Sequence, residues 1–192
     1  MFLLVGLGNP GLSYAYTRHN VGFMLADYLS HCFSFSAFVS RFDSLYCSKV
    51  FDCRQKVFIQ KPQTYMNLSG KAVSQMVSFF QISTQNVFVI HDDIDLEPFD
   101  VKIKISGSSG GHNGIRSIDN TIGKEYWRIK IGVGRPTSKD KVADYVLSPF
   151  YTDELVQMQE RIFSVISNFI LELLFSENKV QVIGKIRSNI KL

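Results

Sequence analysis

FLLVGLGNPGLSYAYTRHN, at residues 2–20, joins a short apolar run to a polar loop rich in glycine. The run at 2–5 has the length of a buried strand, and Gly6 closes it. Beyond the loop, apolar residues recur at helical spacing from Val21 to Phe33. This order of strand, loop and helix predicts the first unit of an α/β fold.

The remainder of the chain repeats this alternation. It predicts one α/β domain over residues 1–192, with a mixed, mostly parallel sheet and helices on both faces. Further strands are expected at 44–52, 56–62, 87–90, 101–106 and 127–134, and helices at 68–81, 115–122 and 153–175.

Polar segments follow three of the expected strands. GNPG at 8–11 follows the first strand, HDDID at 91–95 follows VFVI, and GGHNG at 110–114 follows VKIKIS. In open α/β sheets, ligands bind beyond the carboxyl ends of the strands. We therefore expect these three segments to meet in one crevice.

The charge pattern permits a polyanionic partner without demanding one. The formal net charge is +4, and nine Lys or Arg stand against three acids between residues 102 and 141. A compact group of five acids lies at 92–100, and residues 178–192 hold four basic residues and no acid. This distribution favours a basic face next to a site.

The cysteines and the apolar runs point to the cytoplasm and away from a membrane. Cys32, Cys47 and Cys53 form no CxxC spacing, so we expect them to be reduced. The N-terminal run is too short for a signal peptide, and the apolar run at 162–175 is too short to span a bilayer.

Three local motifs suggest other functions. GLGNPG at 6–11 matches the dinucleotide fingerprint GxGxxG, but no helix starts at its glycines, and a tight loop is the better interpretation. GSSGG at 107–111 matches GxSxG, but only His112 follows it, so a serine triad in that order is not possible. HDDID at 91–95 suits a hard cation, a solvated turn, or an Asp that orients a catalytic histidine.

His19 is the best candidate for a base among the four histidines. It lies in the polar loop between Arg18 and Asn20, just after the first strand, where an imidazole can titrate near neutral pH. On composition alone, a single loop histidine is more often an ordinary surface residue.

Several segments together resemble the bacterial-type peptidyl-tRNA hydrolase family. TRHN, MNLSG and GGHNG are the most specific, and the order and spacing match the family almost up to the long helix. In chain order the segments are GLGNPG at 6–11, YAYTRHNVG at 14–22, KPQTYMNLSGKAV at 61–73, VIHDDIDL at 89–96, GSSGGHNGIRSI at 107–118 and WRIKIGVGRP at 127–136.

The resemblance implies a monomeric esterase that needs no metal or other cofactor and frees tRNA from peptidyl-tRNA. It implies His19 as the general base and Asp92 as the carboxylate that orients it, and it links Asn9 to telling blocked from free aminoacyl-tRNA. The residues implied to bind the substrate, including the acceptor stem and CCA end of tRNA, are Asn9, Tyr14, Tyr65, Met66, Asn67, His112, Asn113, Lys104 and Lys130.

The sequence departs from the usual family pattern at a few positions. Tyr65 is often phenylalanine, Ser108 and Ser109 replace glycine or histidine, and Lys130 stands where arginine is common. Lysine lacks the bidentate fork that arginine offers to phosphate, so these changes bear on tRNA contacts. Two alternatives stay open, a serine or metal hydrolase of small esters and an RNA-binding module without chemistry.

Two alternating strands predict a basic stripe. Lys102 and Lys104 should point to one side of their strand, and so should Arg128 and Lys130. A stripe of this kind suits a double-stranded acceptor stem, which is recognised through phosphate and hydroxyl contacts.

Overall fold

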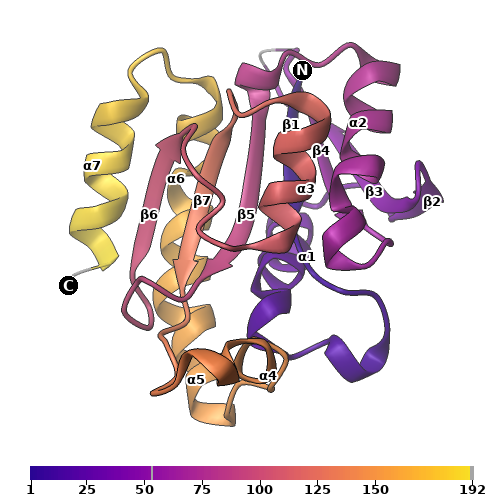
Figure 1. Ribbon diagram of the computed structural model, residues 1–192. Helices are drawn as coiled ribbons and strands as arrows, with labels where there is room; N and C mark the ends of the chain where they lie inside the picture. Colours follow the sequence, from indigo (N-terminus) through magenta and orange to yellow (C-terminus); the bar gives the residue numbers. More distant parts are fainter. Residues whose placement is uncertain (53, 191–192) are drawn as a thin grey trace.

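The computed structural model describes residues 1–52 and 54–190, so Cys53 lies outside the described residues. Its centre is a seven-stranded sheet (Figure 1). In spatial order the strands are β2 (Val39–Arg41), β3 (Ser44–Val50), β4 (Lys56–Pro62), β1 (Phe2–Gly6), β5 (Val87–Asp93), β7 (Trp127–Gly132) and β6 (Val101–Ile105).

The sheet is mixed, with a parallel centre. β4, β1, β5 and β7 pair in parallel, whereas β2, β3 and β6 join at the two sides through antiparallel pairs. The apolar centre strands are buried on both faces, as expected for parallel strands covered by helices. The predicted mixed, mostly parallel α/β sheet is confirmed.

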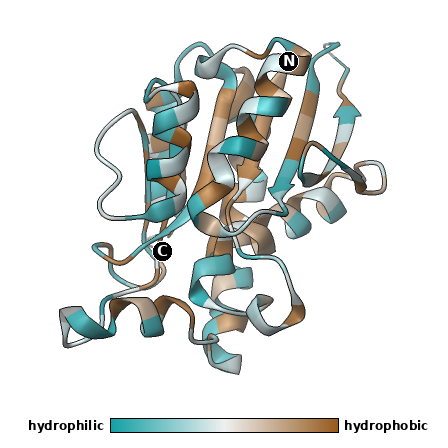
Figure 2. Ribbon diagram, turned by 45° about the vertical axis from the view of Figure 1, so that its right-hand side comes forward, coloured by the Kyte–Doolittle hydropathy of each residue, from teal (hydrophilic) through white to brown (hydrophobic). Residues whose placement is uncertain are grey.

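Helices cover both faces of the sheet (Figure 1). Leu4 belongs to one apolar core, while its neighbours Leu3 and Val5 belong to the other, because alternate strand residues point to opposite faces. Figure 2 shows the brown strands between helices that carry teal residues. One face packs against α2 (Ser69–Phe80) and α3 (Asn113–Ile122), and the other against α1 (Val21–Cys32), α6 (Ser164–Phe175) and α7 (Lys179–Ile190).

The predicted helix over 153–175 is divided. It consists of α5 (Thr152–Gln157), a π-helical segment and α6. In the π-helical segment Met158, Ile162 and Phe163 are all buried, because the wider turn lets two successive side chains face the core. Helical periodicity alone does not reveal this change of pitch.

β5 is longer than the sequence predicted. It continues past the apolar residues 87–90, because His91, Asp92 and Asp93 still pair with β7. The acids are therefore part of the strand end, with alternate side chains facing opposite sides. Among the described residues, no helix is long and apolar enough to cross a membrane.

Candidate active site

His19 is the middle residue of a short 3-10 turn, Arg18–Asn20, that leads from the glycine loop into α1. Asn20 ties this turn to the loop after β1. Its Oδ1 accepts from the amide of Asn9 at 2.8 Å, and its Nδ2 donates to the Asn9 carbonyl at 3.0 Å. The residue after His19 is thus fixed by two buried hydrogen bonds.

Arg18 fixes the other side of His19. Its guanidinium donates to Ser148 Oγ at 2.9 Å, to the Pro149 carbonyl at 2.7 Å, and to both carboxylate oxygens of Glu154 at 2.7 and 3.0 Å. It also lies 4.7 Å from the ring centroid of Tyr145. Only 5% of the Arg18 side chain is exposed, so this is a buried clamp between the His19 turn and a segment far along the chain.

The glycines of the first loop bring α1 close to β1. A Cβ on Gly6 would lie 2.3 Å from the Gly22 carbonyl oxygen, and one on Gly8 would lie 2.6 Å from the Phe23 ring. Both distances are shorter than van der Waals contact, so neither position accepts a side chain. The fingerprint-like glycines serve helix packing in this structure.

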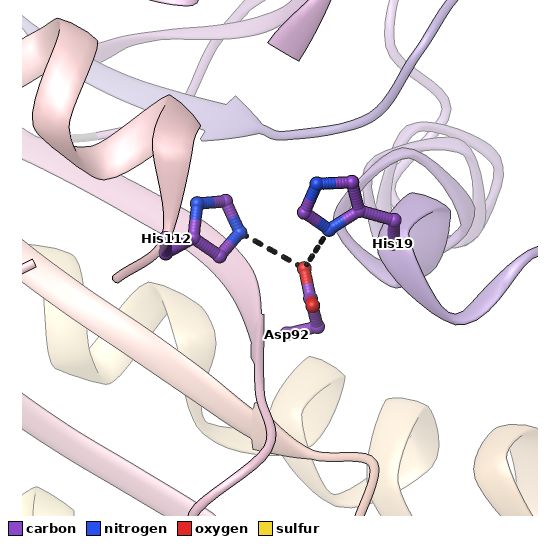
Figure 3. A group of neighbouring side chains, drawn as sticks. All are labelled: His19, Asp92 and His112. Carbon is purple, nitrogen blue, oxygen red and sulfur yellow. Dashed lines mark hydrogen bonds and ion pairs between the residues drawn. The ribbon is translucent and has the colours of Figure 1, made fainter. Parts of the chain in front are cut away.

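One carboxylate oxygen of Asp92 joins two histidines (Figure 3). Asp92 Oδ1 lies 2.8 Å from His19 Nδ1 and 2.9 Å from His112 Nε2. Because the carboxylate only accepts, His19 Nδ1 carries a proton and donates it. The neutral His19 ring therefore keeps its lone pair on Nε2.

The charges of this group depend on one another. Burial by itself lowers the pKa of His19, but the negative charge of Asp92 and the hydrogen bond to it together raise that pKa above 6.5. Burial by itself would raise the pKa of Asp92, but His19 and His112 hold it well below the usual value. Asp92 is therefore ionised at neutral pH, and its negative charge favours the protonated form of His19.

His112 has both ring nitrogens occupied. Nε2 faces Asp92, and Nδ1 accepts from the backbone amides of Gly114 at 3.1 Å and Ile115 at 3.3 Å. His112 thereby caps the N-terminus of α3. His112 also lines the larger cavity, but a hydrogen bond from its imidazole nitrogens to a ligand would have to displace one of these bonds.

His91 lies beside His112 at the end of β5. Its Nδ1 donates to the Asp92 carbonyl at 2.7 Å, and its ring lies edge-on to that of His112 with centroids 4.9 Å apart. Burial, and then the neighbouring His112, hold the pKa of His91 well below its ordinary value. His91 is thus a neutral residue of the strand end.

Two cavities meet at His19. One, of about 260 Å³, is lined by the three asparagines of the motifs together with Tyr65 and Met66. The other, of about 380 Å³, lies between the loop at 109–113 and residues 140–146 and includes Asp92. His19 and Asn113 line both, so a bond that joins two chemical groups can lie beside His19 with one group in each cavity.

Comparison with known proteins identifies the family. The family model described as peptidyl-tRNA hydrolase matches residues 3–190. A peptidyl-tRNA hydrolase of Rickettsia typhi is 46% identical over 187 residues, which cover 95% of this chain and 100% of the relative. A peptidyl-tRNA hydrolase from the Wolbachia of Brugia malayi is 46% identical over 163 residues, which cover 84% of this chain and 89% of the relative. The chain belongs to the peptidyl-tRNA hydrolase family. The crystal structure of the peptidyl-tRNA hydrolase of Acinetobacter baumannii matches with a TM-score of 0.90 at 32% identity, covering 98% of this chain and 95% of that one.

The structure brings most of the predicted peptidyl-tRNA hydrolase site together. Asn9, His19, Met66 and Asn113 line one cavity, although they come from three separate loops. Asn9 also supports this cavity, because its Oδ1 accepts from the Met66 amide at 2.9 Å. Tyr14 lies in the 3-10 helix Leu12–Tyr14 and lines neither cavity of the described structure.

His19, Asp92 and His112 offer three possible metal-ligand atoms within 4.8 Å of one another. A metal needs a lone pair from each imidazole. In His112 this would move the proton to Nδ1, where it would face the amide protons of Gly114 and Ile115. The donor set therefore fits a hydrogen-bond network better than a cation.

The predicted basic stripe is wrong in one member. Lys102 pairs with Lys130 and Lys104 with Arg128 across β6 and β7, so all four point to the same face. Arg128, however, is fully buried and donates to Asp119 at 2.8 Å. Its charge is needed beneath α3, where Asp119 would otherwise be an unpaired buried carboxylate.

Lys104 and Lys130, the two lysines of the stripe that are expected to bind tRNA, differ in their surroundings. Lys130 is ion-paired with Asp93 and largely covered. Lys104 is half-buried and has no acid partner among the described residues. Burial, together with the charges of Lys130, Arg128 and Lys102, lowers its pKa.

Sequence reasoning missed the residues that hold His19 in place. Arg18 and Asn20 were treated only as polar neighbours, and Glu154 was not considered. TRHN carries part of the signal, because Arg18 and Asn20 flank His19 in a tight turn and both have side chains that can anchor it by hydrogen bonds. Glu154 lies 136 positions away, and no local pattern connects it to Arg18.

Proposed function

We propose that His19 is the general base with which this member of the peptidyl-tRNA hydrolase family activates water. The observation that carries the proposal is the hydrogen bond from His19 Nδ1 to Asp92, which leaves the Nε2 lone pair free at the junction of the two cavities. The carboxylate of Asp92 raises the pKa of His19 against the effect of burial, and a more basic imidazole is a better proton acceptor.

The reaction needs no covalent intermediate. Water loses a proton to His19 Nε2 and attacks the ester carbonyl carbon that joins the peptide to the ribose. When the tetrahedral intermediate collapses, the bond from carbon to ribose oxygen breaks, and the proton on His19 returns to that oxygen. Asp92 keeps the imidazole in the correct tautomer throughout and stabilises its positive charge.

The asparagines suit the acyl side of the substrate. Amides donate to a developing oxyanion and pair with peptide groups without changing charge. Asn113 lines both cavities and is our candidate donor to the oxyanion, while Asn9 and Asn67 would hold the peptide portion and its blocked nitrogen. Asn9 has its Oδ1 occupied by Met66, so its Nδ2 is the group available to the substrate.

The nucleotide side would occupy the larger cavity. Asp93 lines this cavity and is ion-paired with Lys130 of β7, so the basic strands β6 and β7 lie next to it. The CCA end would enter here, and the acceptor stem would lie over Lys102 and Lys104. A monomeric enzyme in the cytoplasm, working without a cofactor on peptidyl-tRNA left by translation, accords with this proposal.

The test is hydrolysis of N-acetyl-aminoacyl-tRNA by the purified protein. His19→Ala should lower kcat by roughly 10²–10⁴-fold while tRNA still binds, because general-base catalysis contributes about this much. His31→Ala is the matched control, since His31 is exposed at the end of α1. EDTA should leave the rate unchanged. A near-normal rate for His19→Ala would remove His19 as the base, and loss of activity in EDTA would restore the metal alternative.

A further inference from the structure

His112 is an unusual helix cap. Ser, Thr, Asp and Asn commonly take this position, because a side-chain oxygen accepts from the first amides of the helix. At α3 an imidazole nitrogen does so instead, with Nδ1 at 3.1 Å from the Gly114 amide and 3.3 Å from the Ile115 amide.

The cap determines the tautomer of His112. Backbone amides only donate, so Nδ1 must carry the lone pair, and the proton of the neutral ring must be on Nε2. Nε2 lies 2.9 Å from Asp92 Oδ1 and donates to it. His19 reaches the same oxygen with its Nδ1, so the two histidines have opposite tautomers in their neutral forms.

We propose that His112 is a positioning residue. The amides of α3 hold it as an Nε2–H donor. This donor fixes the Asp92 carboxylate and limits how strongly Asp92 binds the protonated form of His19. The inference rests on the proposed role of His19 as the base. It replaces the substrate contact that the sequence suggested for His112.

The hydrogen bond that His112 donates to Asp92 has two effects. First, it prevents the carboxylate from turning away from His19, since Oδ1 is held from both sides at 2.8 and 2.9 Å. Second, two donors that share one acceptor oxygen each bind it more weakly than one donor alone. Asp92 therefore stabilises the protonated form of His19 less than it would without His112.

Other charged groups near this oxygen do not replace His112. Asp93 of β5 is paired with Lys130 of β7, and Asp140 lines the larger cavity and, in the described part of the chain, forms no hydrogen bond or ion pair with Asp92, His19 or His112. His91 points its donor at the Asp92 backbone carbonyl instead of the carboxylate. Of the described residues, only His19 and His112 hydrogen-bond the carboxylate of Asp92 through their side chains.

The first test reads the tautomers directly. Nitrogen chemical shifts of the two imidazoles in the wild-type protein, measured at a pH where both are neutral, should give Nδ1–H for His19 and Nε2–H for His112. Assignment of the signals comes from the His19→Ala and His112→Asn variants. An Nδ1–H tautomer at His112 would overturn the proposal.

The second test separates the cap from the donor. Asn at position 112 can still accept from the α3 amides but is too short to reach Asp92, whereas Gln can reach Asp92 with its amide but is a poor cap. His112→Asn should keep the wild-type Tm and lower kcat roughly 10-fold with KM little changed. The acidic limb of its kcat/KM profile should move to higher pH, because Asp92 then binds protonated His19 more strongly.

His112→Gln should behave in the opposite way. Its acidic limb should stay close to that of the wild type, while its Tm falls. If His112→Asn instead raises KM with kcat and the acidic limb unchanged, His112 is a substrate contact and the inference is wrong. The proposed base is tested separately, because His19→Ala stays inactive whichever result His112 gives.

Discussion

At the scale of single residues, a carboxylate oxygen sets the protonation of the base. Desolvation alone would leave His19 neutral to lower pH, but Asp92 reverses this and raises its pKa above 6.5. A general base must be neutral to accept a proton, so the proposed role of His19 predicts that activity rises with pH as His19 loses its proton. The midpoint of this acidic limb should lie above pH 6.5 for kcat/KM, which reports the free enzyme.

Asp92→Asn tests this balance. The amide removes the negative charge and leaves only the desolvation of His19, so the acidic limb should move to lower pH. This direction is opposite to that expected for His112→Asn. Turnover should also fall by roughly 10²–10⁴-fold, because the tautomer of His19 is no longer fixed. A full pH–rate profile measures both effects, and an unchanged profile with full activity would contradict the assignment of Asp92.

Asn9→Ala should change selectivity. Because a buried amide left without its partner discriminates strongly between substrates, loss of Asn9 should narrow the rate difference between N-acetylated and free aminoacyl-tRNA. Comparing kcat/KM for the two substrates measures this. An equal loss on both would assign Asn9 to support of the Met66 turn alone, since its Oδ1 accepts from that amide.

At the scale of elements, the turn that carries His19 depends on a distant ion pair. Arg18→Met would leave Glu154 without its partner and break the bonds to Ser148 and Pro149. Breaking a buried pair costs about 3 kcal/mol, which denaturant unfolding can measure. Arg135→Met is the control, because its ion pair with Asp95 is exposed and should contribute less than about 1 kcal/mol. Similar losses of unfolding free energy in both variants would contradict the role of Arg18 as a buried clamp.

Two helical glycines should respond to alanine in opposite ways. A Cβ on Gly70 of α2 would lie 2.2 Å from the Ser117 carbonyl oxygen of α3, so Gly70→Ala must push these helices apart and destabilise the protein. A Cβ on Gly184 of α7 meets nothing within 4 Å. Gly184→Ala should therefore stabilise by about 1 kcal/mol through helix propensity. Thermal unfolding of the two variants compares them, and stabilisation by Gly70→Ala would show that α2 and α3 do not pack closely.

The spacing of apolar residues along the chain predicted most of the helices and strands. The apolar runs placed β1, β4 and β7, and helical spacing placed α1 and α2, because these segments bury one clear face. The same reasoning gave neither the π-helical segment nor α7. The former keeps an apolar face while changing its pitch. The latter buries only Val182, Ile186 and Ile190 among basic and polar residues, and it is held by packing against β6 and α6.

The candidate site was predictable in its residues and not in its geometry. Motif resemblance supplied His19, Asp92 and the asparagines. It could not supply the shared oxygen of Asp92 or the capping role of His112, because both depend on how the His19 turn, the end of β5 and the loop before α3 meet. The burial of Arg128 was missed for the same reason, since alternation fixes the face of a strand and not what covers it.

At the scale of the whole molecule, the basic surface of β6 should bind the acceptor stem. If about 3–4 phosphates are neutralised, the slope of log affinity against log salt should be near −3, and Lys104→Ala should reduce it by about one. Lys71→Ala is the control, because Lys71 is exposed on α2 and paired with Asp43. Filter binding of tRNA over a range of salt measures the slopes. An equal slope for Lys104→Ala and the wild type would place the stem elsewhere, with the basic residues of α7 as the next candidate.

The pair of Arg18 and Glu154 also has a consequence for how the enzyme is made. Its partners are 136 residues apart, and ribosomes add about 5–20 residues per second, so on the order of ten seconds separate their synthesis. During this interval a growing chain already holds His19, the proposed base, but lacks the ion pair that anchors its turn. The protein is itself a peptidyl-tRNA while it is being translated, and the anchor of the turn that carries His19 is incomplete until Glu154 has been added.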